Sequence, residues 1–242
     1  MFVPISDAIP SFGRGNLILE EPYSNLLPEL RQRVRDILAA MPHCHGWDHT
    51  LRVWHNARYI AQVEKADQAV VEYAALLHDI GRAKEFEDLG KSCHAEIGAA
   101  EIPEILAQIG ITDDAFVQHV RECVYTHRYR KRETRRPETL EAKVVFDADK
   151  LDSIGAVGLG RAFHFAGRVG ARVHNAREEA LTSESYSAED TAYREYLVKL
   201  QHIHENMLTE EGKRMAEQRH HFMQQFFERL NREVLGKDYG VG

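Results

Sequence analysis

Apolar residues recur every three or four positions along most of the chain, which is the spacing of one helical face. From residue 28 onward the pattern predicts helices at about 28–41, 48–65, 67–80, 94–109, 112–129 and 140–153. Asp48 is an expected N-cap of the second helix. A glycine-interrupted stretch follows at 155–170, and two further helices are expected between about 190 and 235. Because no segment alternates like a strand, the pattern predicts an all-α fold.

The first 27 residues lack this periodicity and are interrupted by proline and glycine. We expect an irregular leader at 1–27 and a single helical domain over 28–242. The core of that domain should span about 45–160. A C-terminal pair of helices, at about 190–235, should pack on this core through the apolar face of the last helix, expected over 211–234.

Composition narrows the classes of partner. The chain has 242 residues, is 43% hydrophobic and carries a formal net charge of -7. An acidic chain is a poor general binder of nucleic acid, so a polyanionic substrate needs a local basic site. No apolar run approaches the roughly 20 residues of a membrane span. The N-terminal segment has no signal-peptide pattern, so we expect a cytoplasmic protein with reduced cysteines. The sequence indicates no oligomeric state.

Three motifs carry residues that bind metals: HGWDHTLRVWHNA at 45–57, ALLHDIGRAKE at 75–85 and VVFDADKLDSIGAVG at 144–158. Each alone has an ordinary explanation, such as a buried histidine, a helix cap or an ion pair. Together they place two imidazoles and two carboxylates at or near apolar helical faces, where a carboxylate is costly unless it is paired. A mixed N/O site of this kind suits Mn, Mg, Ni, Fe, Co or Zn. The predicted ligands of this divalent metal ion are His49, His78, Asp79 and Asp149.

The order of these residues resembles the H…HD…D signature of the HD-domain phosphohydrolase superfamily. More narrowly, HGWDHTLRV, ALLHDIGR and DADKLDSIGAVG resemble a small bacterial subgroup of stand-alone HD hydrolases, some of which act on nucleotides. The resemblance runs from about His45 through KRMAEQRHHFM in the last helix. It implies an HD-domain helical bundle with a central divalent metal and hydrolysis of phosphate esters or anhydrides, and it leaves the substrate open.

Phosphoryl transfer at such a site also needs cations and positioned carboxylates. Arg52, Arg82 and Lys84 are candidates for binding substrate phosphates, although each could be ordinary surface charge. The candidate catalytic residues are Asp79, Lys150 and Asp152. Of these, Asp152 could orient a metal ligand or the attacking water, or simply pair with Lys150.

Two further histidines and a basic run bear on the substrate. His94 and His127 are expected to contact substrate or to support the metal ligands, and a second metal ion there remains open. The basic run at 128–136 could overhang the pocket or be a solvated loop.

The resulting hypothesis is a metal-dependent phosphohydrolase that acts on a small phosphorylated metabolite, with a nucleotide as the expected substrate. One alternative is a phosphodiesterase for a cyclic or oligonucleotide substrate, which only the basic run supports. The other is a regulatory HD module that binds metal and nucleotide without turnover.

Overall fold

The computed structural model describes residues 23–39, 41, 46–88, 91–128 and 136–237. Every regular element in these ranges is a helix, and none of them is a strand, so the predicted all-α fold is confirmed. No helix within them is long and apolar enough to cross a membrane. Most of the expected leader, at 1–22, and most of the basic run, at 129–135, lie outside the described residues.

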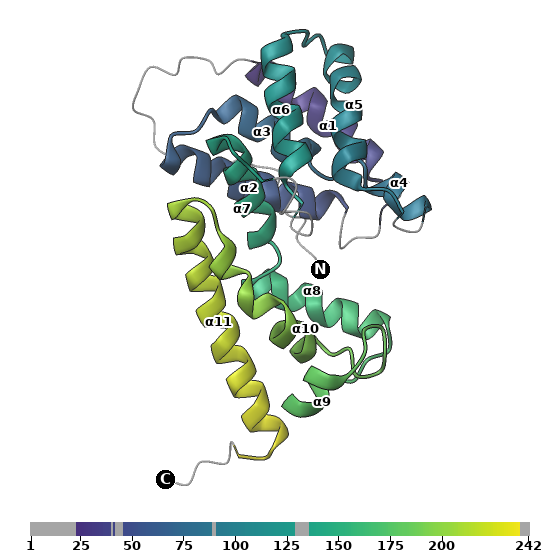
Figure 1. Ribbon diagram of the computed structural model, residues 1–242, viewed down its shortest axis with the longest axis vertical. Coiled ribbons are helices and arrows are strands. Elements are labelled where there is room, and N and C mark those ends of the chain that lie inside the picture. Colours follow the sequence, from purple (N-terminus) through teal and green to yellow (C-terminus); the bar gives the residue numbers. More distant parts are fainter. Residues whose placement is uncertain (1–22, 40, 42–45, 89–90, 129–135, 238–242) are drawn as a thin grey trace, which may run out of the picture.

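Two groups of helices are stacked on one another (Figure 1). The first group holds α1 (Leu27–Ile37), α2 (Trp47–Glu64), α3 (Gln68–Leu77), α4 (Arg82–Glu87), α5 (His94–Gln108), α6 (Asp114–Thr126) and α7 (Leu140–Leu151), and a 3-10 turn, η1 (Ser24–Leu26), precedes it. The second group holds α8 (Gly155–Arg168), α9 (Arg177–Thr182), α10 (Ala192–Val198) and α11 (Glu210–Val234), with the 3-10 turns η4 (Leu200–His202) and η5 (His204–Asn206) before α11.

Side-chain caps explain where several of these helices begin. The side chains of Asp67, Asp113 and Thr139 accept hydrogen bonds from backbone N–H groups in the first turns of α3, α6 and α7. Such caps satisfy amides that have no partner within the helix. The cap predicted for α2 is wrong, because Gly46 is its N-cap and Asp48 already lies in the first turn. The extended backbone of Gly46 starts that helix without a side-chain acceptor.

The glycine-interrupted stretch forms a continuous helix, α8, directly after α7. Gly155 has a φ of 74°, a conformation that glycine adopts without steric cost. A Cβ on Gly158 would lie 2.3 Å from the carbonyl oxygen of Ser153. These two glycines therefore allow the tight connection that starts α8 beside the end of α7.

The two helices expected at the C-terminal end are α10 and α11, and α10 is shorter than expected. The last helix, α11, agrees with the predicted range, but α10 ends at Val198 because Lys199 leaves the helical conformation, with φ -144° and ψ -57°. The rings of Tyr196 on α10 and Phe227 on α11 stack with their centroids 4.4 Å apart. Near its first turn, α11 also packs against α2 and α7 of the first group (Figure 1).

A buried carboxylate joins the two groups at that point. Asp147 on α7 accepts hydrogen bonds from the backbone N–H of Leu208 at 2.9 Å and from the N–H and hydroxyl of Thr209 at 2.8 and 2.7 Å. Its side chain is fully buried. A Cβ on Gly212 would lie 2.2 Å from the Asp147 carboxylate, so only glycine fits there. Asp147 thus fixes the start of α11 against α7.

We expect Asp147→Ala to lower the free energy of unfolding by about 3 kcal/mol, because it leaves several buried donors without an acceptor. Chemical denaturation monitored by circular dichroism measures this loss. Asp114→Ala, at an exposed position in α6, is the matched control and should change stability little. Equal stability of the two variants would contradict the role given to Asp147.

Candidate metal centre and adjoining cavity

The four predicted metal ligands meet at the ends of three helices. His49 lies in the first turn of α2 and Asp149 in the last turn of α7, whereas His78 and Asp79 directly follow α3. The Nε2 atom of His49 lies 3.2 Å from Nε2 of His78. It also lies 3.6 Å from a carboxylate oxygen of Asp79 and 3.5 Å from one of Asp149. All four side chains are buried.

Each of these imidazoles has its Nδ1 atom occupied by a protein acceptor. His78 Nδ1 donates to the carbonyl oxygen of Ala75 at 2.8 Å, and His49 Nδ1 donates to Asp152 at 2.7 Å. The hydrogen on Nδ1 leaves Nε2 with its lone pair directed into the cluster. Both histidines therefore present the nitrogen that a metal ion would bind.

This arrangement fits a cation. Two lone pairs on nitrogens 3.2 Å apart repel one another unless a proton or a positive ion lies between them. His49, His78 and Asp79 each offer a ligand atom within 4.8 Å of the others, and Asp149 adds a further oxygen. Imidazole nitrogen and carboxylate oxygen together form a donor set for a borderline divalent cation.

A second group of possible ligands shares Asp79. His94 begins α5 and His127 directly follows α6, and their Nε2 atoms lie 3.3 Å apart. They are 3.5 and 3.7 Å from an oxygen of Asp79. Glu85 holds Nδ1 of His94 at 2.9 Å, and the carbonyl of Val124 holds Nδ1 of His127 at 2.6 Å. Asp79 thus lies between two pairs of imidazoles. In both pairs the Nδ1 atoms are held by protein acceptors and the Nε2 atoms face one another.

Burial sets the protonation of most of these histidines. It lowers the pKa of His78 to about 4 and also lowers the pKa values of His94 and His127. Burial likewise opposes charge on His49, but hydrogen bonds to Asp149 and Asp152 outweigh it and raise the pKa of that imidazole. Three of the four imidazoles are therefore neutral at pH 7, the form in which histidine binds metals.

The two central carboxylates are ionised. Although burial favours the neutral acid, Arg82 beside Asp79 and Lys150 beside Asp149 hold both carboxyl pKa values well below their usual range. Arg82 Nε donates to Asp79 at 2.9 Å, and the Lys150 ammonium contacts Asp149. The cluster therefore combines anionic oxygens with the neutral imidazoles of His78, His94 and His127.

Asp152 supports the cluster from behind His49. Besides His49 Nδ1, its carboxylate accepts hydrogen bonds from Arg52 Nε at 2.7 Å and from a terminal nitrogen of Arg161 at 2.8 Å. Burial opposes ionisation, but these partners lower the pKa of Asp152 to about 2. The structure thus places Asp152 as the acceptor for the imidazole of His49, a candidate metal ligand. Arg52 pairs with Asp152.

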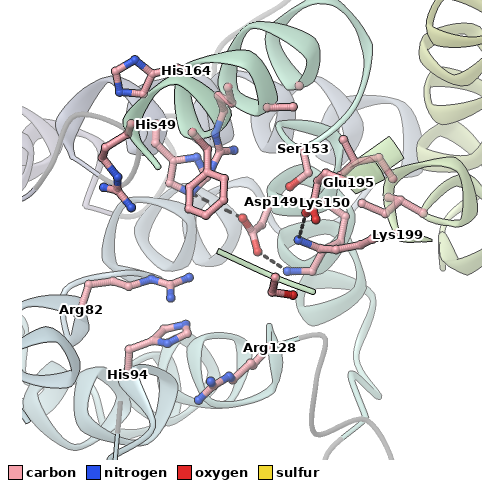
Figure 2. Close-up of a pocket in the computed structure, with 18 of the residues that line it drawn as sticks. His49, Arg82, His94, Arg128, Asp149, Lys150, Ser153, His164, Glu195 and Lys199 are labelled. Carbon is pink, nitrogen blue, oxygen red and sulfur yellow. Dashed lines mark hydrogen bonds and ion pairs between the residues drawn. The ribbon is translucent and has the colours of Figure 1, made fainter. Parts of the chain in front are cut away.

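An open cavity of about 940 Å³ adjoins the cluster. Figure 2 shows Arg82, His94 and Arg128 on one side of it and Asp149 and Lys150 on another. Lys84 is not brought to the cavity, because its ammonium pairs with Glu101 and its side chain is 63% exposed. The other wall belongs to the second group of helices, which contributes Arg161, Phe165, Arg168, Tyr186, Asp190 and Lys199.

Several residues in this network did not stand out in the sequence. Glu85, within one of the motifs, accepts hydrogen bonds from His94 and Arg82 and pairs with Arg128 at 3.2 Å. Arg161 could have been found from its position, because it shares a face of α8 with Gly158 and Phe165.

Arg219 on α11 is another such residue. It donates to the carbonyl oxygen of Leu151 and, at 3.0 Å, to the side-chain oxygen of Asn56. Asn56 in turn donates to the carbonyl oxygen of Ala148 at 3.3 Å. The last helix thereby holds the turn of α7 that carries Asp149. No local pattern indicates a contact across so many residues.

Comparison with known proteins agrees with this arrangement. The HD domain family model matches residues 46–154, which contain His49, the His78-Asp79 pair and Asp149. The Bacillus subtilis protein YpgQ is 33% identical over 213 residues, covering 87% of this chain and 94% of the relative.

Solved structures show the same fold. A crystal structure of YpgQ superposes with a TM-score of 0.68 at 31% identity and covers 88% of this chain and 98% of that one. YpgQ has also been crystallised in complex with ADP. An HD-superfamily hydrolase from Bacillus thuringiensis superposes with a TM-score of 0.67 at 27% identity, covering 87% of this chain and 97% of its own. From its sequence relatives and its fold, this chain belongs to the HD-domain superfamily of hydrolases.

Proposed function

We propose that this protein is a metal-dependent phosphohydrolase whose substrate is a nucleotide. The observation that carries the proposal is the buried cluster of His49, His78, Asp79 and Asp149, which opens onto a cavity lined with cationic side chains. Ionised carboxylates and neutral imidazoles suit a divalent metal ion, and the neighbouring cations suit an anionic substrate.

His49, His78, Asp79 and Asp149 would hold the metal ion. When bound, a divalent cation at such a site supplies Lewis-acid activation of water and charge stabilisation on a phosphoryl oxygen. Asp152 keeps His49 in the tautomer and orientation that this binding requires, since it accepts the Nδ1 hydrogen.

The cationic side chains of the cavity would bind the phosphate groups of the substrate. Arg82, Arg128, Lys150 and Arg161 all line the cavity. Each also pairs with a carboxylate of the site, so its head group is held in position before a phosphate arrives. Charge that develops on phosphoryl oxygens is stabilised best by such fixed donors.

The tautomer and the neutral state of His94 and His127 suit the binding of a second cation better than direct contact with a phosphate. Their Nδ1 atoms already donate to Glu85 and to the backbone of Val124, and burial keeps both rings neutral. A neutral imidazole with this tautomer has no hydrogen on Nε2 to donate to a phosphate oxygen. We therefore propose that these two histidines and Asp79 can hold a second ion.

The nucleotide assignment rests on two supports. The cavity of about 940 Å³ is large enough for a nucleotide and is lined by both cationic and aromatic side chains. YpgQ, which covers 87% of this chain in alignment, was crystallised with ADP. The described residues give no comparable support to the phosphodiesterase alternative, because most of the basic run lies outside them.

A metal-by-substrate screen tests the function. Chelator-stripped protein is reloaded with Mn, Mg, Co, Ni or Zn and offered nucleoside mono- and triphosphates, a cyclic dinucleotide and a chromogenic phosphodiester. We expect metal-dependent release of phosphate or pyrophosphate from a nucleotide. Cleavage of the diesters alone would favour a phosphodiesterase, and tight nucleotide binding without turnover would favour a regulatory module.

Substitution of a ligand should remove metal and activity together. We expect His78→Ala and Asp149→Ala each to reduce hydrolysis to background, with the bound metal measured by mass spectrometry after dialysis. His221→Ala is the matched control, because this histidine is exposed on α11, away from the cavity. Wild-type activity in either ligand variant would overturn the metal assignment.

Asp152→Asn should act through His49. Loss of the anionic acceptor weakens the orientation of that imidazole, so we expect metal affinity or kcat to fall about 10–100-fold. Calorimetric titration of the stripped protein with metal measures the affinity, and Asp36→Asn on the exposed face of α1 is the control. Unchanged affinity and unchanged kcat would show that Asp152 does not position a ligand.

A further inference from the structure

The cavity extends along α8, away from the metal cluster. Arg161, Phe165 and Arg168 line it at the three- and four-residue spacing of one helical face. Arg161 is at the cluster end, where it contacts Asp152 at 2.8 Å. Because α8 rises about 1.5 Å per residue, Arg168 lies about 10 Å farther along the axis than Arg161.

Tyr186 stands out in the segment that faces this outer part. It lines the cavity, yet the residue is 75% exposed. Its φ of 61° is in the left-handed region, which is costly for a residue with a Cβ. The backbone N–H of Tyr186 donates to Asp190 at 2.7 Å, and buried Asp190 also accepts from Arg194 at 3.1 Å. The fold therefore holds an aromatic ring in solvent, where it contributes little to the hydrophobic core.

Phe165 extends the aromatic surface. Its ring centroid lies 5.8 Å from that of Tyr186, with the rings at 70° to one another. The guanidinium carbon of Arg168 lies 5.4 Å from the Phe165 ring centroid. The exposed ring of Tyr186 and the half-buried ring of Phe165, beside a guanidinium, form a surface that attracts the flat rings of nucleic-acid bases.

We propose that Tyr186 and Phe165 form the site for the base of the bound nucleotide, while its phosphates lie toward Arg161 and the metal cluster. This inference rests on the proposed nucleotide substrate. Along α8, Phe165 lies about 6 Å and Arg168 about 10 Å from Arg161, a range that a ribose with its phosphates bridges. Because stacking uses the face that every base presents, the site accepts different bases with modest preferences.

Two probes test the site without requiring turnover. Calorimetry of the metal-loaded protein compares the binding of ADP with that of inorganic pyrophosphate, which has no base. Tyr186→Ala should weaken ADP binding about tenfold and leave pyrophosphate binding unchanged. Tyr186→Phe keeps the ring and should bind ADP like the wild type. Phe222→Ala removes an exposed ring on α11 outside the cavity and should change neither affinity.

Other outcomes overturn the inference. They are an unchanged ADP affinity in Tyr186→Ala, an equal loss for ADP and pyrophosphate, or wild-type protein that binds ADP no more tightly than pyrophosphate. A loss confined to Phe86→Ala would assign the base to the opposite wall, where Phe86 on α4 also lines the cavity. If Tyr186→Ala weakens ADP binding selectively but no nucleotide is hydrolysed, the base site stands and the proposed catalysis fails.

Discussion

The burial of three carboxylates on one helix is the constraint around which this structure is organised. Asp147, Asp149 and Asp152 all lie at the end of α7, and burying each charge is costly unless partners surround it. Asp147 faces the start of α11, Asp149 faces the imidazole cluster, and Asp152 faces His49 with two arginines. The two groups of helices are thus held together by the same helix that carries the candidate metal ligand Asp149.

Much of the fold could be predicted from the sequence, because helical periodicity and capping are local properties. The range of α11 and the start of α3 beside Asp67 follow from a few neighbouring residues. The end of α10 at Val198 did not follow, since tertiary packing determines where a short helix stops. The cap of α2 did not follow either, because Gly46 starts that helix without a side-chain acceptor.

Part of the candidate site could likewise be predicted from local sequence, and part could not. His49 and Asp149 could be recognised because a polar residue on an apolar face is unusual within its own helix. The residues that hold His49 and Asp149 in place could not be recognised from the sequence. Arg219 approaches α7 from the last helix, and Arg52 pairs with Asp152 across 100 positions of sequence. Such contacts depend on how helices pack, for which a single sequence carries little signal.

The anchored Nδ1 atoms bear on how a metal ion would enter the candidate site. Acceptors that belong to the polypeptide orient the rings of His78, His127 and His49, while a proton or a cation would still relieve the repulsion between the facing Nε2 atoms of His49 and His78. A structural zinc finger, in contrast, folds only when metal arrives. An ion that binds here would meet imidazoles that are already oriented, so little side-chain entropy would be lost on binding. Under the proposed function, the mixed nitrogen and oxygen donor set would accept several divalent cations, so the identity of the bound ion would depend on availability in the cell.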